Sequence, residues 1–154
     1  MHDFERQDSP QTLAEGLAEY YRKNPQLSQL RGMSPEAQDF FRSHDTVHVV
    51  YGCSTSLPHE AVVKLSSVFG TTGGFGVLRG YPLHESTEIY RELPFAETAR
   101  TTLSALVIVP RTVWRCLRQR RRWPWREFAG HLEQPLAELR EEFGIRVAGG
   151  GRNA

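Results

Sequence analysis

The residues best suited to chemistry lie in the segment HDTVHVVYGCSTSLPHE, residues 44–60. His44 and His48 are four residues apart, so on a helix they would share one face at about 5–6 Å, close enough for both imidazoles to bind one ion. Asp45 stands where zinc proteases of the HExxH type carry their general base. Glu60 could supply a further carboxylate. Imidazole and carboxylate ligands suit zinc, iron or manganese better than calcium or copper(I).

Two helices would have to position these side chains. Serine and proline at the start and glycine at the end predict one helix over residues 34–52 and a second over residues 56–70. The turn between them is short, so the second helix should fold back beside the first. Glu60, in the first turn of the second helix, would then lie level with His44 and His48.

A simpler interpretation of the same residues stays open. His44 and His48 could be ordinary polar residues on a half-buried helix face, with Asp45 pairing locally. Spacing and side-chain chemistry alone do not decide between this interpretation and a metal site.

The rest of the chain indicates a mainly α fold, a single-domain helical bundle of about five to seven helices. Further helices are expected over residues 9–24, over 85–122 with interruptions near Pro94 and Pro110, and over 133–144. The glycine-rich residues 70–80 read as a loop or short hairpin, and their spacing misses the dinucleotide-binding fingerprint. We expect a flexible N-terminus over residues 1–8, the helical domain over 9–147, and a disordered tail over 148–154.

Charge and cysteine content favour an intracellular protein without a membrane span. The formal net charge is +1, so the overall charge does not indicate a nucleic-acid partner. Cys53 and Cys116 are too few for a disulfide framework, which is typical of a reducing compartment. The longest apolar run, residues 103–110, is too short to cross a bilayer as a helix.

The segment HDTVHVVYGCSTSLPHEAVVK resembles the signature of the coenzyme Q (ubiquinone) biosynthesis protein 4 family. That signature is HD, two residues, H, eleven residues, E, and His44, Asp45, His48 and Glu60 fall on its four defined positions. The stretch WREFAGHLEQPLAELREEFGI, residues 125–145, is similar to the family's C-terminal region. We interpret the chain as a short bacterial relative.

The resemblance implies a mostly helical, membrane-associated protein that binds a divalent metal through His44, Asp45, His48 and Glu60. Because adjacent helix positions point about 100° apart, Asp45 is either a ligand or a partner that orients an imidazole. Zinc is the first expectation, and iron(II) or manganese are alternatives. The implied ligand is a polyprenylated quinone precursor or another isoprenoid lipid. The implied activity is oxidative decarboxylation at ring carbon 1, as a metal-dependent decarboxylase or hydroxylase of a polyprenyl benzoate. A non-catalytic lipid-binding or scaffold protein that organises the other quinone biosynthesis enzymes is the alternative.

These expectations extend to location and partners. We expect a cytoplasmic protein that is peripheral to the inner face of the membrane, contacts an anionic membrane surface and can form a homodimer. A tunnel for the isoprenoid tail would be lined by apolar side chains, each of which could instead be ordinary core. The candidates are Phe41, Val47, Tyr51, Phe69, Leu103, Leu106 and Val107.

The segment WRCLRQRRRWPWR, residues 114–126, combines arginines with tryptophans. Arginines beside indoles fit the headgroup layer of a membrane. RNA binding is a less favoured alternative, because arginine and aromatic residues also contact phosphates and stack on bases. The third interpretation is a solvated helix face with its tryptophans packed inward. The candidate contact residues are Arg118, Arg120, Arg121, Arg122, Trp123 and Trp125.

Overall fold

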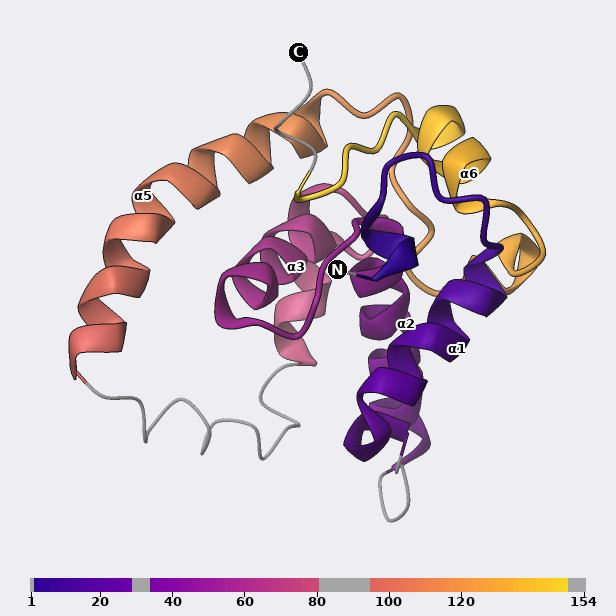
Figure 1. The fold of residues 1–154 in the computed structure, drawn as a ribbon, viewed down its shortest axis with the longest axis horizontal. Helices are drawn as coiled ribbons and strands as arrows, with labels where there is room; N and C mark the ends of the chain where they lie inside the picture. Colours follow the sequence, from indigo (N-terminus) through magenta and orange to yellow (C-terminus); the bar gives the residue numbers. More distant parts are fainter. Residues whose placement is uncertain (1, 29–33, 81–94, 150–154) are drawn as a thin grey trace.

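The computed structural model describes residues 2–28, 34–80 and 95–149, and within these ranges the chain is mainly helical, as predicted (Figure 1). No β-strand forms among the described residues, where only two isolated bridges are found. The α-helices are α1 (Leu13–Lys23), α2 (Pro35–Val50), α3 (Leu57–Phe69), α5 (Phe95–Leu117) and α6 (Leu136–Phe143), and the short 3-10 helices are η1 (Asp3–Glu5), η2 (Pro25–Ser28), η3 (Gly74–Arg79) and η5 (Phe128–His131).

The two helices that carry the HxxxH segment and Glu60 begin where the sequence predicts. The Ser34 hydroxyl accepts a hydrogen bond from the backbone N–H of Ala37 at 3.2 Å and caps α2. Ser56 occupies the N-cap position of α3, and a proline lies in the first turn. Gly52, between the helices, has φ of 63°. A Cβ atom there would lie 2.8 Å from the side chain of Val147, so this turn requires glycine.

The N-cap of α1 lies three residues later than the predicted N-cap, Ser9. Its N-cap is Thr12, whose hydroxyl accepts from the backbone N–H of Glu15 while the Glu15 carboxylate accepts from the N–H of Thr12. The carbonyls of Ser9 and Gln11 instead accept hydrogen bonds from the first turn of α6. The predicted start is therefore wrong because a distant segment uses these backbone groups.

The second half of the chain differs from prediction at two places. The glycine-rich segment forms the 3-10 helix η3 rather than a hairpin. The predicted interruption near Pro110 is wrong: α5 continues through this residue to Leu117. The region around Pro94 lies outside the described residues, as do residues 150–154 of the predicted disordered tail.

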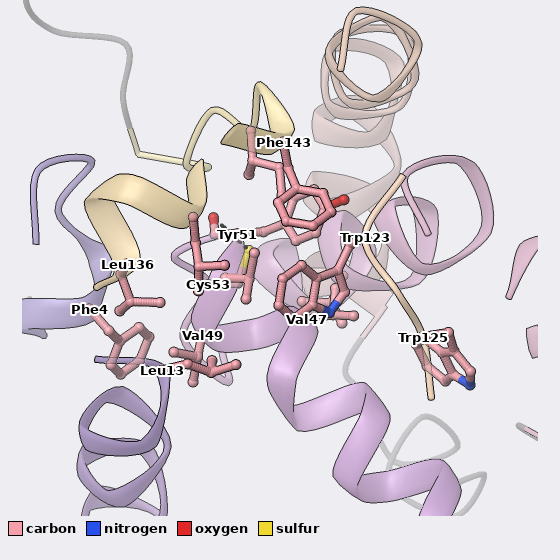
Figure 2. Packing of buried hydrophobic residues seen from close by; sticks show 14 of the residues in the cluster. Phe4, Leu13, Val47, Val49, Tyr51, Cys53, Trp123, Trp125, Leu136 and Phe143 are labelled. Atoms are coloured by element: carbon pink, nitrogen blue, oxygen red, sulfur yellow. Dashed lines mark hydrogen bonds between the residues drawn. The ribbon is translucent and has the colours of Figure 1, made fainter. Parts of the chain in front are cut away.

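The hydrophobic core joins both ends of the described chain to α2 (Figure 2). Val47 and Val49 of α2 are fully buried, and so is Phe4 near the N-terminus. The prediction of a flexible N-terminus is therefore wrong around Phe4. Burial of its apolar ring in the core holds this part of residues 1–8 in place. From the C-terminal part, the buried residues include Trp123, Leu136, Leu139, Phe143 and Ile145.

Contacts between helices place α3 against both α2 and α5, and α2 also contacts α1 and α6. In Figure 1, α5 runs along the outside of the molecule, while α6 lies beside the N-terminal segment. No helix in the described part of the chain is long and apolar enough to cross a membrane.

Candidate metal centre

Three of the four residues in the HD-x-x-H and glutamate pattern meet at the contact between α2 and α3. His44, His48 and Glu60 each offer one ligand atom, and these atoms lie within 4.8 Å of one another. Glu60 Oε1 is 3.2 Å from His48 Nε2, and Glu60 Oε2 is 4.0 Å from His44 Nε2. The helical four-residue spacing and the short turn after α2 therefore produce the convergence that the sequence predicts.

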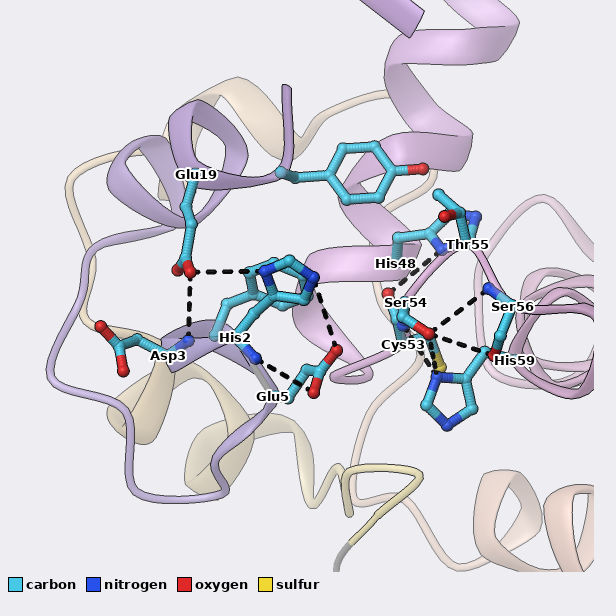
Figure 3. A network of polar contacts seen from close by, with 12 residues as sticks. His2, Asp3, Glu5, Glu19, His48, Cys53, Ser54, Thr55, Ser56 and His59 are labelled. Carbon is cyan, nitrogen blue, oxygen red and sulfur yellow. Dashed lines mark hydrogen bonds and ion pairs between the residues drawn. The ribbon is translucent and has the colours of Figure 1, made fainter. Parts of the chain in front are cut away.

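His48 is held in one orientation by the backbone. Its side chain is fully buried, and its Nδ1 lies 3.2 Å from the carbonyl oxygen of Cys53 (Figure 3). Because a carbonyl can only accept, this contact places the proton on Nδ1 and leaves a lone pair on Nε2 in the neutral ring. Within the described chain, His48 Nε2 has no hydrogen bond of acceptable geometry. Histidines that bind metals are typically oriented in this way through their second nitrogen.

The charge of Glu60 matches the same arrangement. Burial raises the pKa of this carboxyl, but contact with His48, whose Nε2 lies 3.2 Å away, and the positive charge of His48 and His44 in their protonated forms outweigh that effect and hold its pKa below the usual value. Glu60 is therefore a carboxylate at neutral pH. Two imidazole nitrogens and one carboxylate oxygen form a ligand set that zinc, iron(II) and manganese accept.

Asp45, predicted as a ligand or as a partner that orients an imidazole, is not one of the three clustered residues. Consecutive residues on a helix point about 100° apart, so Asp45 faces away from Glu60. Its Oδ2 accepts a hydrogen bond from the hydroxyl of Tyr21 at 2.8 Å, and its Oδ1 lies 3.8 Å from His44 Nδ1. The Asp45 carboxylate thus lies behind the His44 ring, on the side opposite the Nε2 that faces Glu60.

Aromatic rings cover the two histidines on other sides. The Tyr20 ring lies 5.1 Å from the His48 ring between centroids, and the Phe40 ring stacks on His44 at 6.2 Å. Burial raises the pKa of Tyr20 far above its usual value, and the carboxylates of Asp45 and Glu60 add to this effect. Tyr20 has the helical spacing of a core residue, so its sequence position did not indicate a place beside the centre.

The neighbouring His59 has a different role. Its Nδ1 accepts a hydrogen bond from the backbone N–H of Ser54 at 2.8 Å, and the Ser54 hydroxyl is 2.9 Å away (Figure 3). Burial lowers the pKa of His59. The ring stabilises the turn before α3 and is not one of the three clustered residues.

The residues predicted to line a tunnel are dispersed. Val47 and Tyr51 belong to the core, whereas Phe41 and Phe69 are half-buried. Leu106 and Val107 are 73% and 65% exposed, because they lie on the face of α5 that points away from α3. The Leu103 side chain lies outside the described part. A cavity of about 440 Å³ lies elsewhere, with Phe40, Val77 and Trp125 in its wall, and none of the predicted tunnel residues lines it.

The arginine and tryptophan segment divides into a buried and an exposed part. Trp123 and Trp125 are 0% and 6% exposed, so their prediction as membrane or phosphate contacts is wrong, because both rings pack inside the protein. The arginines are on the surface, where Arg121 forms an ion pair with Glu142 at 2.7 Å. The exposed members are Arg118, Arg120, Arg121 and Arg122.

Comparison of the chain with family models, with curated proteins and with solved structures finds no match. The candidate centre is therefore defined by the geometry of His44, His48 and Glu60.

Proposed function

We propose that the chain binds one divalent metal ion through His44, His48 and Glu60. The observation that carries the proposal is the buried Nε2 of His48, which faces the Glu60 carboxylate while Nδ1 is held by the Cys53 carbonyl. A buried polar atom without a directed hydrogen bond is costly, and a metal ion would satisfy it. Asp45 would orient His44 from behind rather than bind the ion.

Zinc is the ion we expect first, with iron(II) and manganese as alternatives for the same ligands. Three protein ligands leave at least one position open for water or for an oxygen of a bound molecule, which is typical of catalytic rather than structural zinc sites. An ion there could polarise a phenol or carboxylate or, if it is iron, support chemistry with oxygen. The protein's own contribution is to orient both imidazoles, keep Glu60 ionised and cover the ligands with Tyr20 and Phe40.

For the biological role, we propose that the metal serves the synthesis of a polyprenylated quinone, with oxidative decarboxylation at ring carbon 1 as the reaction. This proposal is supported by the resemblance of residues 44–60 and 125–145 to the coenzyme Q biosynthesis protein 4 family. The open coordination position is consistent with chemistry on a bound oxygen. A non-catalytic lipid carrier or scaffold would contain the same three ligands and is distinguished by lacking turnover.

The metal proposal can be tested by elemental analysis of the purified protein and by titration with zinc. We expect one zinc, iron or manganese per chain and a zinc affinity that Glu60→Gln lowers by at least about tenfold, because glutamine cannot supply a carboxylate. Glu138→Gln is the matched control, because it makes the same substitution at an exposed glutamate of α6 outside the cluster. Wild-type protein without metal, or equal affinity in both variants, would contradict the proposal.

The biological role has its own test. Lipids extracted from purified protein should include a polyprenylated ring compound detectable by mass spectrometry. Incubation of metal-loaded protein with a polyprenyl hydroxybenzoate should release its carboxyl carbon as CO₂ in the presence of oxygen. Metal binding without turnover would favour the carrier or scaffold alternative.

A further inference from the structure

Helix α5 carries most of the large apolar side chains that the described structure leaves exposed. Its exposed members are Leu106, Val107, Val109, Trp114 and Leu117, with exposed fractions between 41% and 73%. The only others among the described residues are Phe75 and Leu78 of η3. A concentration of exposed apolar side chains on one helix indicates a surface that is covered in use.

Four of these five side chains form one stripe, and Val109 lies about 60° outside it. At about 100° per residue, Leu106, Leu117, Trp114 and Val107 fall within an arc of roughly 100° around the helix. Cys116 lies on the opposite side and faces α3, where its Sγ is 3.9 Å from the Ser66 hydroxyl. Helix α5 is thus amphipathic, with one face packed against α3 and an apolar face exposed. Figure 1 shows that the helix lies on the outside of the molecule.

Arginines border this α5 stripe along one edge. Arg111 and Arg118 follow the apolar residues within roughly a further 40° of arc, and both are exposed. The Arg118 guanidinium stacks over the Trp114 ring at 4.2 Å from the centroid. Residues 98–126 contain eight arginines and no aspartate or glutamate. The surface therefore combines an apolar stripe with a single sign of charge.

We propose that the α5 stripe is a docking surface for an anionic lipid bilayer, with α5 lying in the plane of the membrane surface. The leucines, Val107 and the Trp114 ring would enter the boundary between headgroups and acyl chains, while Arg111 and Arg118 contact anionic headgroups. This combination of an apolar face and bordering arginines is typical of interfacial helices. Docking uses α5 and not Trp123 or Trp125, and it does not depend on the metal centre.

Charge argues against the two other occupants of such a surface. A symmetric contact between two copies of this face would bring Arg111 and Arg118 of one chain near those of the other, with no acidic residue in this segment to neutralise them. A nucleic acid would satisfy the arginines but leave the leucines in water, because phosphate contacts bury little aliphatic surface.

The test is flotation of the purified full chain with phosphatidylcholine vesicles that contain or lack phosphatidylserine. We expect binding to the anionic vesicles, weakened by salt. Replacing Leu106 and Leu117 together by serine should reduce the partition coefficient by at least about tenfold, because two exposed leucines no longer enter the lipid. Arg111→Gln and Arg118→Gln should each reduce it by about fivefold on anionic vesicles.

Phe75→Ser is the matched control, because Phe75 is 70% exposed but lies on η3 instead of α5. It should bind vesicles as the wild type does, and all variants should keep the wild-type helical content and metal content. Equal binding of the wild type and the double serine variant would overturn the proposal. So would absence of vesicle binding, a dimer that the double serine variant disperses, or binding to single-stranded RNA that exceeds binding to anionic vesicles.

Discussion

Two buried polar groups lie at the same end of α2 and differ in how their hydrogen bonds are satisfied. Arg140 of α6 is 1% exposed and donates to the carbonyls of Val49 and Val50, at 2.9 Å each, and to those of Phe4 and Arg6. Burial lowers the pKa of Arg140 to about 10. Two of the partners, the carbonyls of Val49 and Val50, lie at the negative C-terminal end of α2, which suits a cation.

The candidate metal centre on the same helix has the opposite character. His48 is as deeply buried as Arg140, yet its Nε2 faces Glu60 without a directed hydrogen bond in the described chain. A buried guanidinium whose three nitrogens all donate to carbonyls stabilises the fold, whereas a buried lone pair next to a carboxylate has capacity for a ligand. Arg140 therefore has the environment of a structural polar group, whereas His48 has that of a candidate ligand.

The largest expected change in the free energy of unfolding comes from replacing the buried Arg140. Arg140→Met should lower the free energy of unfolding by about 3 kcal/mol or more, because it removes charged donors and leaves buried carbonyls without partners. Urea denaturation of the metal-free protein would measure this. A loss below about 1 kcal/mol would show that the carbonyls find water, and Arg140 would not be the structural member of the pair.

Zinc binding should have the next largest effect on the free energy of unfolding, and this effect should require His48. Zinc at a free concentration one hundred times its dissociation constant should raise the free energy of unfolding by about 2.7 kcal/mol. The same zinc should give His48→Gln little or no increment. Urea denaturation with zinc and with a chelator provides the comparison, and equal stability of the wild type under both conditions would mean that zinc does not bind at His48.

Asp45 should affect the metal centre without being part of it. Asp45→Asn should weaken zinc binding by about 10–100-fold, because the carboxylate behind His44 helps to orient that ring. Competition with a chromophoric chelator measures the affinity, and X-ray absorption should show the same ligand atoms in wild type and variant. A lost oxygen ligand would instead make Asp45 a member of the centre.

The smallest effect is expected for an arginine on the surface. Arg121 pairs with Glu142 at 2.7 Å, but the two side chains are 64% and 37% exposed. Arg121→Gln should therefore change the free energy of unfolding by no more than about 0.5 kcal/mol. If Arg121→Gln lowered the free energy of unfolding as much as Arg140→Met does, burial would not explain the different contributions of the two arginines.

Local signals predicted much of the site. The limits of α2 and α3 follow from caps, prolines and glycines, and these signals act within a few residues. The shared face of His44 and His48 follows from helical periodicity alone. The start of α1 was not predictable in this way, because Ser9 offers a local start signal while its carbonyl is used by α6. The inward packing of Trp123 and Trp125 could not be predicted from local signals either. Tryptophan suits both a core and a membrane surface, so its residue type does not decide between them.

By itself, the sequence determined the mainly α fold and the convergence of His44, His48 and Glu60, because periodicity, caps and a short turn act over neighbouring residues. Only the tertiary structure decided that Asp45 lies behind His44 and that Arg140 is a buried partner of distant carbonyls. It also decided that the exposed apolar surface belongs to α5. These outcomes depend on which faces of separate helices meet, and that choice is made by the burial of the whole core.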